Sequence, residues 1–155
     1  MLELSKESAM PFYFAYGSNM DAERLGKRIG AAKLTGIGSV TGYDLCFNKR
    51  SVDGSGKANL IERADAVVEG VIFEVSVTQL LKLDGIEKGY HREPVSVVIN
   101  GVAHSAITYI AAADQIDNSL SPTTEYLRFI TRGAEKFGLS EAYRRRLEKR
   151  STGQE

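Results

Sequence analysis

The sequence predicts an α+β domain in which helices flank a mixed, mostly antiparallel, barrel-like sheet. Three observations support this fold class. A strand pattern, a helix, several strands, a short helix, a hairpin and two helices follow one another along the chain. Asn100-Gly101 separates two apolar runs, and this dipeptide is the strongest short signal for an antiparallel hairpin. The chain has no Gly-rich phosphate-loop motif and does not resemble a doubly wound parallel sheet.

The length and composition indicate one globular domain. The chain has 155 residues, of which 43% are hydrophobic and 26% charged, and this is enough for a substantial core. No internal repeat or long linker separates a second domain. We therefore expect a single domain over residues 11–150, with residues 1–10 and 151–155 as flexible termini.

The charge balance and the single cysteine restrict the partners and the compartment. Twenty Lys and Arg residues balance twenty Asp and Glu residues, which gives no electrostatic argument for nucleic acid or an anionic membrane. No apolar run approaches the ~20 residues that a membrane-spanning helix needs, and the charged N-terminus is not a secretory signal. Cys46 cannot form an internal disulfide and reads as a small buried hydrophobe in a strand. We expect a cytoplasmic protein without a nucleic-acid or membrane partner.

The first half of the chain alternates between strand and helix signals. Aromatic residues crowd 12–17, which predicts a strand, and 21–29 has acidic residues early and basic residues late, as a short helix prefers. Residues 33–48 are punctuated by glycines and predict one or two strands with bends or bulges. A polar Gly- and Ser-rich loop follows at 49–57. Two strands are then predicted, a short one at 58–61 and a stronger one at 66–75.

The second half begins with a helix that ends near Gly85. Ser76-Val77-Thr78-Gln79 fits a capping box, so the helix should start there. After a short charged connection at 86–92, residues 94–100 and 102–110 form the predicted hairpin.

Two helices are predicted to end the chain. Ser121 is predicted as the N-cap of the first, with Pro122 at its first helical position and Gly138 at its end. Ser140 should cap the last helix, at about 140–150.

The turn Tyr16-Gly17-Ser18-Asn19 joins the first strand to the first helix. Gly17 permits close approach to the backbone, and short polar side chains follow it beside exposed N–H groups. Such a turn suits a carboxylate or a developing oxyanion. The alternative is an ordinary turn with Asn19 or Asp21 as the helix cap.

Glu87 is the carboxylate most suited to proton transfer. It follows an apolar helix and lies beside Ile86 and Tyr90, where partial burial would raise its pKa. The alternative is a solvated glutamate or one paired with Lys88 or Arg92. Asp84 competes for the same role, although it could equally cap the turn around Gly85.

The remaining polar signals are weaker. Tyr16 and Tyr126 can each be half-buried core residues, and Ser18 has no visible His–Asp partner, which disfavours a serine hydrolase. His91 and His104 lack metal-ligand spacing, so we expect no metal site. The basic run at 143–150 suits either a phosphate contact or, more often, a solvated helix face.

Taken in order, these features resemble the γ-glutamylcyclotransferase-like family, which includes the AIG2-like proteins. Tyr16-Gly17-Ser18-Asn19-Met20 resembles its signature turn, and Leu83-Asp84-Gly85-Ile86-Glu87, followed by Gly89-Tyr90, resembles its acidic motif. The other matching segments are Gly42-Tyr43 with Leu45 and Phe47, Gly56-Lys57-Ala58-Asn59-Leu60, Val68-Glu69-Gly70-Val71-Ile72-Phe73, Ser121-Pro122, Tyr126, Gly133-Ala134, Gly138-Leu139 and Tyr143. The resemblance covers roughly residues 12–147.

The resemblance implies a barrel-like fold with a pocket at the signature turn. It also implies an enzyme, a γ-glutamylcyclotransferase that works without metal or organic cofactor. The α-amine of a γ-glutamyl substrate attacks the γ-carbonyl, and 5-oxoproline and a free amine are released. Glu87 would be the general acid/base, and Tyr16, Gly17, Ser18, Asn19 and Tyr126 would bind the substrate.

The resemblance leaves the substrate and the assembly open. Gly85 stands where the family's enzymes often have a second acidic residue, and the segment Lys88–Arg92 is basic, which permits a larger or anionic substrate. The alternatives are a γ-glutamylamine, a γ-glutamyl-protected biosynthetic intermediate, glutathione, or a non-catalytic small-molecule binding module. Arg50 is a further candidate substrate contact, and a homodimer is one of the assemblies left open.

Overall fold

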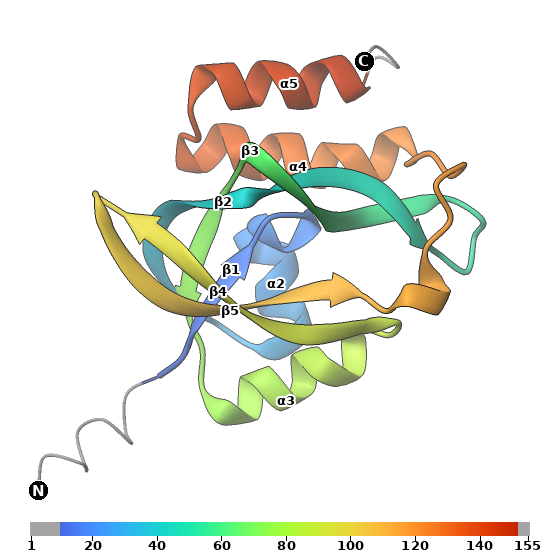
Figure 1. Cartoon of the computed structure of the whole chain (residues 1–155). Helices are drawn as coiled ribbons and strands as arrows, with labels where there is room; N and C mark the ends of the chain where they lie inside the picture. Colours follow the sequence, from blue (N-terminus) through green and yellow to red (C-terminus); the bar gives the residue numbers. More distant parts are fainter. Residues whose placement is uncertain (1–9, 152–155) are drawn as a thin grey trace, which may run out of the picture.

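The computed structural model describes residues 10–151, and within them five strands form one closed barrel (Figure 1). The strands are β1 (Phe12–Ala15), β2 (Lys33–Arg50), β3 (Gly56–Glu74), β4 (Tyr90–Ile99) and β5 (Val102–Ala111). They follow one another around the barrel in the order β1-β3-β2-β4-β5. All pairings are antiparallel except the contact of β1 with β5, at Tyr13 and Ile107, which closes the barrel. The predicted fold class is therefore confirmed.

Short and long helices surround this barrel. They are η1 (Ser18–Met20), α2 (Ala22–Ile29), α3 (Val77–Ile86), η2 (Ala113–Gln115), α4 (Thr124–Phe137) and α5 (Glu141–Ser151). Figure 1 shows α4 and α5 side by side along one side of the barrel and α3 on the opposite side. Within residues 10–151, every helix is too short or too polar to traverse a lipid bilayer.

The predicted flexible termini lie almost wholly outside the described residues. The structure describes neither 1–9 nor 152–155. Ser151, which the sequence places in the C-terminal tail, is instead the last residue of α5.

Strands β2 and β3 form one long antiparallel hairpin. The prediction of two strands at 58–61 and 66–75 is wrong, because the chain between them continues as part of β3. Tyr43 pairs with Glu62 and Thr41 with Val67, so the extra residues of β3 bulge between these two pairs. Asp65 lies in this bulge with a φ of 69°, a left-handed conformation that Asp tolerates better than most residues. The predicted bends of β2 are confirmed as three shifts of register.

The second hairpin is longer than predicted. Asn100 and Gly101 have φ values of 50° and 81°, as the turn of a tight hairpin requires, so the turn is confirmed. Residues 90–92, predicted as part of a connection, instead pair with β5, since Tyr90 lies opposite Ala111. Strand β4 therefore starts only three residues after Glu87.

The helix caps largely follow the sequence. The capping box of Ser76 and Gln79 is confirmed, and Gly138 ends α4 with a left-handed φ of 76°. Ser140 also caps α5 as predicted, because its Oγ accepts from the N–H of Tyr143 at 3.2 Å.

The predicted start of α4 is wrong. Thr123, not Ser121, is the N-cap, and its hydroxyl accepts from the N–H of Tyr126 at 3.0 Å. Pro122 precedes this cap and lies outside the helix. The carbonyl of Ser121 instead accepts from the N–H of Gly56 at 2.8 Å, which joins this segment to β3.

The η1 turn is held against α4 by a close contact. Met20 is fully buried, and a Cβ added at Gly133 of α4 would lie 2.8 Å from the Cβ of Met20 and 3.0 Å from its carbonyl carbon. The small residue at 133 therefore sets how closely η1 approaches the helix.

We expect Gly133→Ala to lower the free energy of unfolding by about 1–3 kcal/mol, because the added methyl group overlaps Met20. Gly26→Ala is the matched control. A Cβ at helical Gly26 meets nothing within 4 Å, so this change should raise stability by ~0.5–1 kcal/mol. Chemical denaturation of both variants measures the difference. A Gly133→Ala protein as stable as Gly26→Ala would show that this contact is not tight.

Candidate active site

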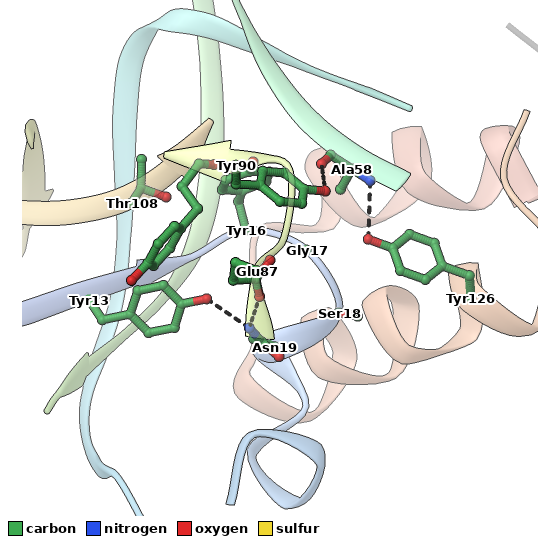
Figure 2. A pocket seen from close by; sticks show the side chains of 11 residues that line it. Tyr13, Tyr16, Gly17, Ser18, Asn19, Ala58, Glu87, Tyr90, Thr108 and Tyr126 are labelled. Atoms are coloured by element: carbon green, nitrogen blue, oxygen red, sulfur yellow. Dashed lines mark hydrogen bonds between the residues drawn. The ribbon is translucent and has the colours of Figure 1, made fainter. Parts of the chain in front are cut away.

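A cavity of about 40 Å³ lies where β1 ends, beside the η1 turn (Figure 2). It is lined by Tyr13, Tyr16, Gly17, Ser18, Asn19, Ala58, Glu87, Tyr90, Thr108, Tyr109 and Tyr126. All six residues predicted for the site are among these. The structure therefore brings Glu87 together with the signature turn, although 68 residues separate Glu87 from Asn19.

The floor of the cavity is the turn after β1. The N–H of Met20 donates to the carbonyl of Gly17 at 3.0 Å, and the N–H of Asp21 donates to that of Ser18 at 3.2 Å. Asp21, one of the two caps named in the alternative interpretation of this turn, begins α2 by accepting from the N–H of Arg24. Among the described residues, the N–H groups of Ser18 and Asn19 at the start of η1 have no acceptor.

Gly17 faces the opposite wall of the cavity at short distance. A Cβ added there would lie 3.1 Å from the Cβ of Ala58 and 3.7 Å from the hydroxyl of Tyr126. A larger side chain would therefore fill the space between β1 and β3.

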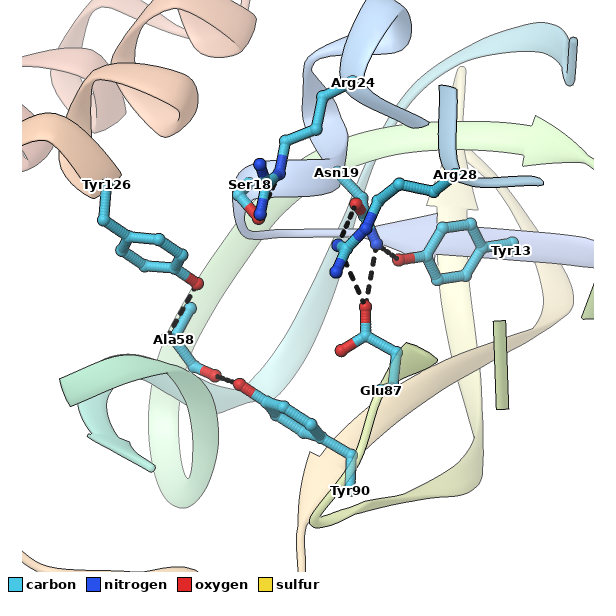
Figure 3. A network of polar contacts seen from close by, with 9 residues as sticks. All are labelled: Tyr13, Ser18, Asn19, Arg24, Arg28, Ala58, Glu87, Tyr90 and Tyr126. Atoms are coloured by element: carbon cyan, nitrogen blue, oxygen red, sulfur yellow. Dashed lines mark hydrogen bonds and ion pairs between the residues drawn. The ribbon is translucent and has the colours of Figure 1, made fainter. Parts of the chain in front are cut away.

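Glu87 enters the cavity from the end of α3, where its N–H donates to the carbonyl of Leu83 at 2.8 Å. Its Oε2 accepts a hydrogen bond from Asn19 Nδ2 at 3.0 Å (Figure 3). The same Nδ2 donates to the hydroxyl of Tyr13 at 3.0 Å. Arg28 Nη1 donates to Asn19 Oδ1 at 3.1 Å and lies 3.8 Å from Glu87 Oε2. One asparagine amide thus fixes the carboxylate, a tyrosine and an arginine.

Burial raises the pKa of the Glu87 carboxyl above its usual value. Its side chain is only 14% exposed, and loss of hydration disfavours the charged form. Arg28, the hydrogen bond from Asn19, Arg24 and Lys49 act in the opposite direction. The pKa of Glu87 is therefore shifted toward neutral pH, as a group that both accepts and donates protons requires.

The two predicted tyrosines have different partners. Tyr16 donates its hydroxyl to the carbonyl of Tyr109 at 2.6 Å, whereas the hydroxyl of Tyr126 accepts from the N–H of Ala58 at 3.1 Å. Tyr90 donates to the carbonyl of the same Ala58 at 2.7 Å. Burial raises the pKa of Tyr16 and of Tyr126, which keeps both hydroxyls protonated at neutral pH.

Five lining residues were not predicted as site residues, namely Tyr13, Ala58, Tyr90, Thr108 and Tyr109. Ala58 and Tyr90 lie inside segments that resemble the family, and this resemblance is the sequence signal for them. Tyr13 lies four positions before Gly17, so the alternation of side chains along a strand places both residues on the same side of the chain. Thr108 and Tyr109 carry no signal in the sequence, since only closure of the barrel brings β5 beside β1.

Asp84, the competing carboxylate, does not line the cavity. It accepts two hydrogen bonds from Arg92, at 2.8 and 2.6 Å, and one from the hydroxyl of Tyr109 at 2.5 Å. The Arg92 guanidinium holds the pKa of the Asp84 carboxyl below its usual value. Arg92 is engaged with Asp84, and among the described residues the ion pair of Glu87 is with Arg28, not with Lys88 or Arg92 as in the alternative interpretation of the sequence.

Other candidates from the sequence lie elsewhere. Arg50 points to the η2 segment, where Nη1 donates to the carbonyl of Asp114 at 3.3 Å, and it lines neither this cavity nor the pocket next to it. In the basic run, Arg146 pairs with Asp44 at 3.2 Å. Cys46 is half-buried in β2, and burial raises the pKa of its thiol. Residues 10–151 contain no group of three or more His, Cys, Asp or Glu side chains placed to hold a metal ion.

The chain is similar to a known protein family and to proteins of two organisms. A family model described as gamma-glutamyl cyclotransferase, AIG2-like, matches residues 13–128. A gamma-glutamylcyclotransferase of Bos taurus is 26% identical over 151 residues, which cover 92% of this chain and 80% of that protein. The putative gamma-glutamylcyclotransferase YkqA of Bacillus subtilis is 29% identical over 148 residues, covering 86% of this chain but only 50% of YkqA.

Solved structures show the same similarity. One named gamma-glutamyl cyclotransferase is 26% identical, with a TM-score of 0.81 over 89% of this chain and 86% of that one. An uncharacterized protein of Homo sapiens is 25% identical, with a TM-score of 0.83 over 91% of this chain and 88% of that one.

The raised pKa of Glu87 predicts how Glu87→Gln changes stability with pH. A carboxyl whose pKa is raised on folding stabilises the protein at low pH and loses this contribution as pH rises through the raised value. The neutral amide avoids the loss. We therefore expect Glu87→Gln to gain stability relative to the wild type as pH rises above about 4. Urea unfolding at several pH values measures this difference.

Asp84→Asn is the control with the opposite sign. Because the pKa of Asp84 is lowered on folding, its charged form stabilises the wild type above the unfolded pKa. The stability of Asp84→Asn relative to the wild type should therefore fall as pH rises. A stability difference for Glu87→Gln that does not change with pH would contradict a carboxyl pKa raised by burial.

Proposed function

Because the chain belongs to the gamma-glutamyl cyclotransferase, AIG2-like family, we propose that it converts a γ-glutamyl amino acid or amine to 5-oxoproline and the free amine. The family is enzymatic, and this chain is one of its enzymes. The observation that carries the proposal is the largely buried Glu87 carboxylate, held by Asn19 beside the turn at 16–19. In the proposed reaction the α-amine nitrogen attacks the γ-carbonyl carbon and closes a five-membered ring. The bond from that carbon to the leaving nitrogen then breaks, so no water is consumed.

Glu87 is suited to both proton transfers. The α-amine must lose a proton as the ring closes, and the leaving nitrogen must gain one as its bond breaks, so one carboxylate can take the first proton and return it to the second site. The contacts that Glu87 receives from Asn19 and Arg28 both end on Oε2, which leaves Oε1 for the substrate. The raised pKa supports an acid/base role rather than a role in binding alone.

The turn supplies the groups that would hold the substrate. N–H groups at Gly17, Ser18 and Asn19 suit the α-carboxylate or the oxyanion that forms on the γ-carbonyl oxygen. The nucleophile is already tethered to its electrophile, so holding the glutamyl chain in a folded conformation supplies much of the acceleration. Tyr16 and Tyr126, whose hydroxyls are engaged with backbone, form firm walls for this conformation.

We expect Glu87→Gln to lower kcat by about 10²- to 10⁴-fold, since the amide cannot carry a proton between the two nitrogens. Ser18→Ala is the matched control in the same cavity. The Ser18 hydroxyl accepts from Arg24 Nε at 3.2 Å and takes no part in the proton transfer assigned to Glu87, so its loss should cost much less. Release of 5-oxoproline from a panel of γ-glutamyl dipeptides and amines measures both effects. An inactive Ser18→Ala beside an active Glu87→Gln would reverse the assignment.

We also expect Gly17→Val to abolish binding, because its methyl groups would fill the space in front of Ala58 and Tyr126. Calorimetric titration with 5-oxoproline measures the affinity, and circular dichroism checks the fold. Gly26→Val is the control, since a Cβ at that position meets nothing within 4 Å. Wild-type affinity in a folded Gly17→Val would place the substrate elsewhere.

A further inference from the structure

A larger pocket of about 290 Å³ adjoins the cavity and shares Ser18, Glu87, Tyr90 and Tyr126 with it. We call it the outer pocket. Its charged lining residues are Arg24, Arg28, Lys49, Lys57, Lys88 and Glu87. Five cations therefore face one carboxylate, although the whole chain has a net charge of zero.

This positive charge is only partly neutralised by the protein. Among the ion pairs of residues 10–151, only that of Arg28 with Glu87, at 3.8 Å, joins a cation of the outer pocket to a carboxylate. Two further carboxylates act on these cations without forming an ion pair among the described residues. Asp21, which caps α2, acts on Arg24, and exposed Asp53, which accepts from the hydroxyl of Ser55 at 2.6 Å, acts on Lys57. The pocket therefore keeps an excess of positive charge.

The two lysines are held in place around the entrance to the cavity. Lys49 Nζ lies 5.2 Å from the ring centre of Tyr90, and Lys57 Nζ lies 4.1 Å from that of Tyr126. Lys49 is also buried against Gly89, where an added Cβ would lie 2.8 Å from its Nζ. Burial lowers the pKa of both lysines, so each is partly desolvated without a carboxylate partner among the described ion pairs. An anionic ligand would supply the missing charge.

The arrangement of the two spaces assigns a part of the substrate to each. The cavity of about 40 Å³ is lined by the turn at 17–19, and its small size suits the reacting glutamyl end rather than the leaving group. Glu87 lines both spaces, so the scissile bond should lie at their boundary and the leaving group in the outer pocket. A leaving group with a single carboxylate would pair with only part of the cationic lining.

We propose that the substrate is a γ-glutamyl compound whose leaving group carries at least two negative charges, bound by Arg24, Lys49 and Lys57 in the outer pocket. This inference rests on the proposed function, because it concerns the leaving group of the same reaction. The charges can be two carboxylates or a phosphate, since lysine and arginine bind both.

Two pairs of substrates test the inference. γ-Glutamylglutamate and γ-glutamylglutamine have nearly the same shape and differ by one negative charge. γ-Glutamyl-O-phosphoserine and γ-glutamylserine test a phosphate in the same way. We expect kcat/KM to favour the more anionic member of at least one pair by about tenfold, and the preference to shrink as ionic strength rises. The pair with the larger ratio identifies carboxylate or phosphate as the preferred charge.

Variants then connect the preference to the outer pocket. Lys57→Gln should reduce the ratio toward one, and so should Lys49→Gln. Lys57 is half-buried, so its variant tests the inference even where loss of the buried Lys49 disturbs folding. Arg50→Gln is the matched control, because Arg50 follows Lys49 in β2 but lies outside both spaces, and its ratio should equal that of the wild type.

The outcomes separate the two proposals. Equal kcat/KM values within both pairs in the wild type would overturn the anionic leaving group and leave the cyclotransferase in place. A ratio unchanged in folded Lys57→Gln and Lys49→Gln would also overturn it. No 5-oxoproline from any of the four compounds or from the wider dipeptide panel would overturn the proposed function, and the inference with it.

Discussion

The site depends on one hydrogen-bonded contact, that of the Asn19 amide with the Glu87 carboxylate. Asn19 is placed by η1, which packs through Met20 against Gly133 of α4, while Glu87 is placed by the end of α3. A buried carboxylate without a partner would cost several kcal/mol. The hydrogen bond from Asn19 to Glu87 therefore also links η1 to the end of α3. The same amide also holds Tyr13 and Arg28, and a shift of η1 would therefore be felt by every side chain around Glu87.

The sequence predicts the fold well wherever a local signal sets the backbone. Asn100-Gly101 specifies its turn through two left-handed residues, and Ser76 with Gln79 specifies the start of α3. Prediction fails where pairing partners distant in sequence decide the outcome. The polar residues after Ile61 read as a break, yet β3 continues because β2 still pairs with it on both sides of the bulge. Likewise Thr123 displaces Ser121 as the cap because the Ser121 carbonyl is engaged with Gly56.

The site was predictable only in part, for the same reason. Its floor and its carboxylate lie in short segments whose order along the chain is informative. Thr108 and Tyr109 reach the cavity through the parallel contact of β1 with β5, which no local pattern shows. The cationic lining of the outer pocket is equally hidden, because its members come from α2, β2, β3 and the segment after α3. A neutral chain can therefore contain a strongly charged pocket, and net charge bears on the whole surface rather than on a site.

The cations of the outer pocket also affect the pKa of Glu87. Burial raises the pKa of Glu87, while Arg28, Arg24 and Lys49 oppose that rise. If an anionic leaving group pairs with Arg24 and Lys49, their opposition weakens and the carboxylate becomes a stronger base, as the proposed removal of a proton from the α-amine would require. When the leaving group departs, it takes its negative charge with it, and the cations again favour the ionised carboxylate. The outer pocket would then do more than bind the leaving group, because its occupancy would set the proton affinity of Glu87 at each stage of the reaction.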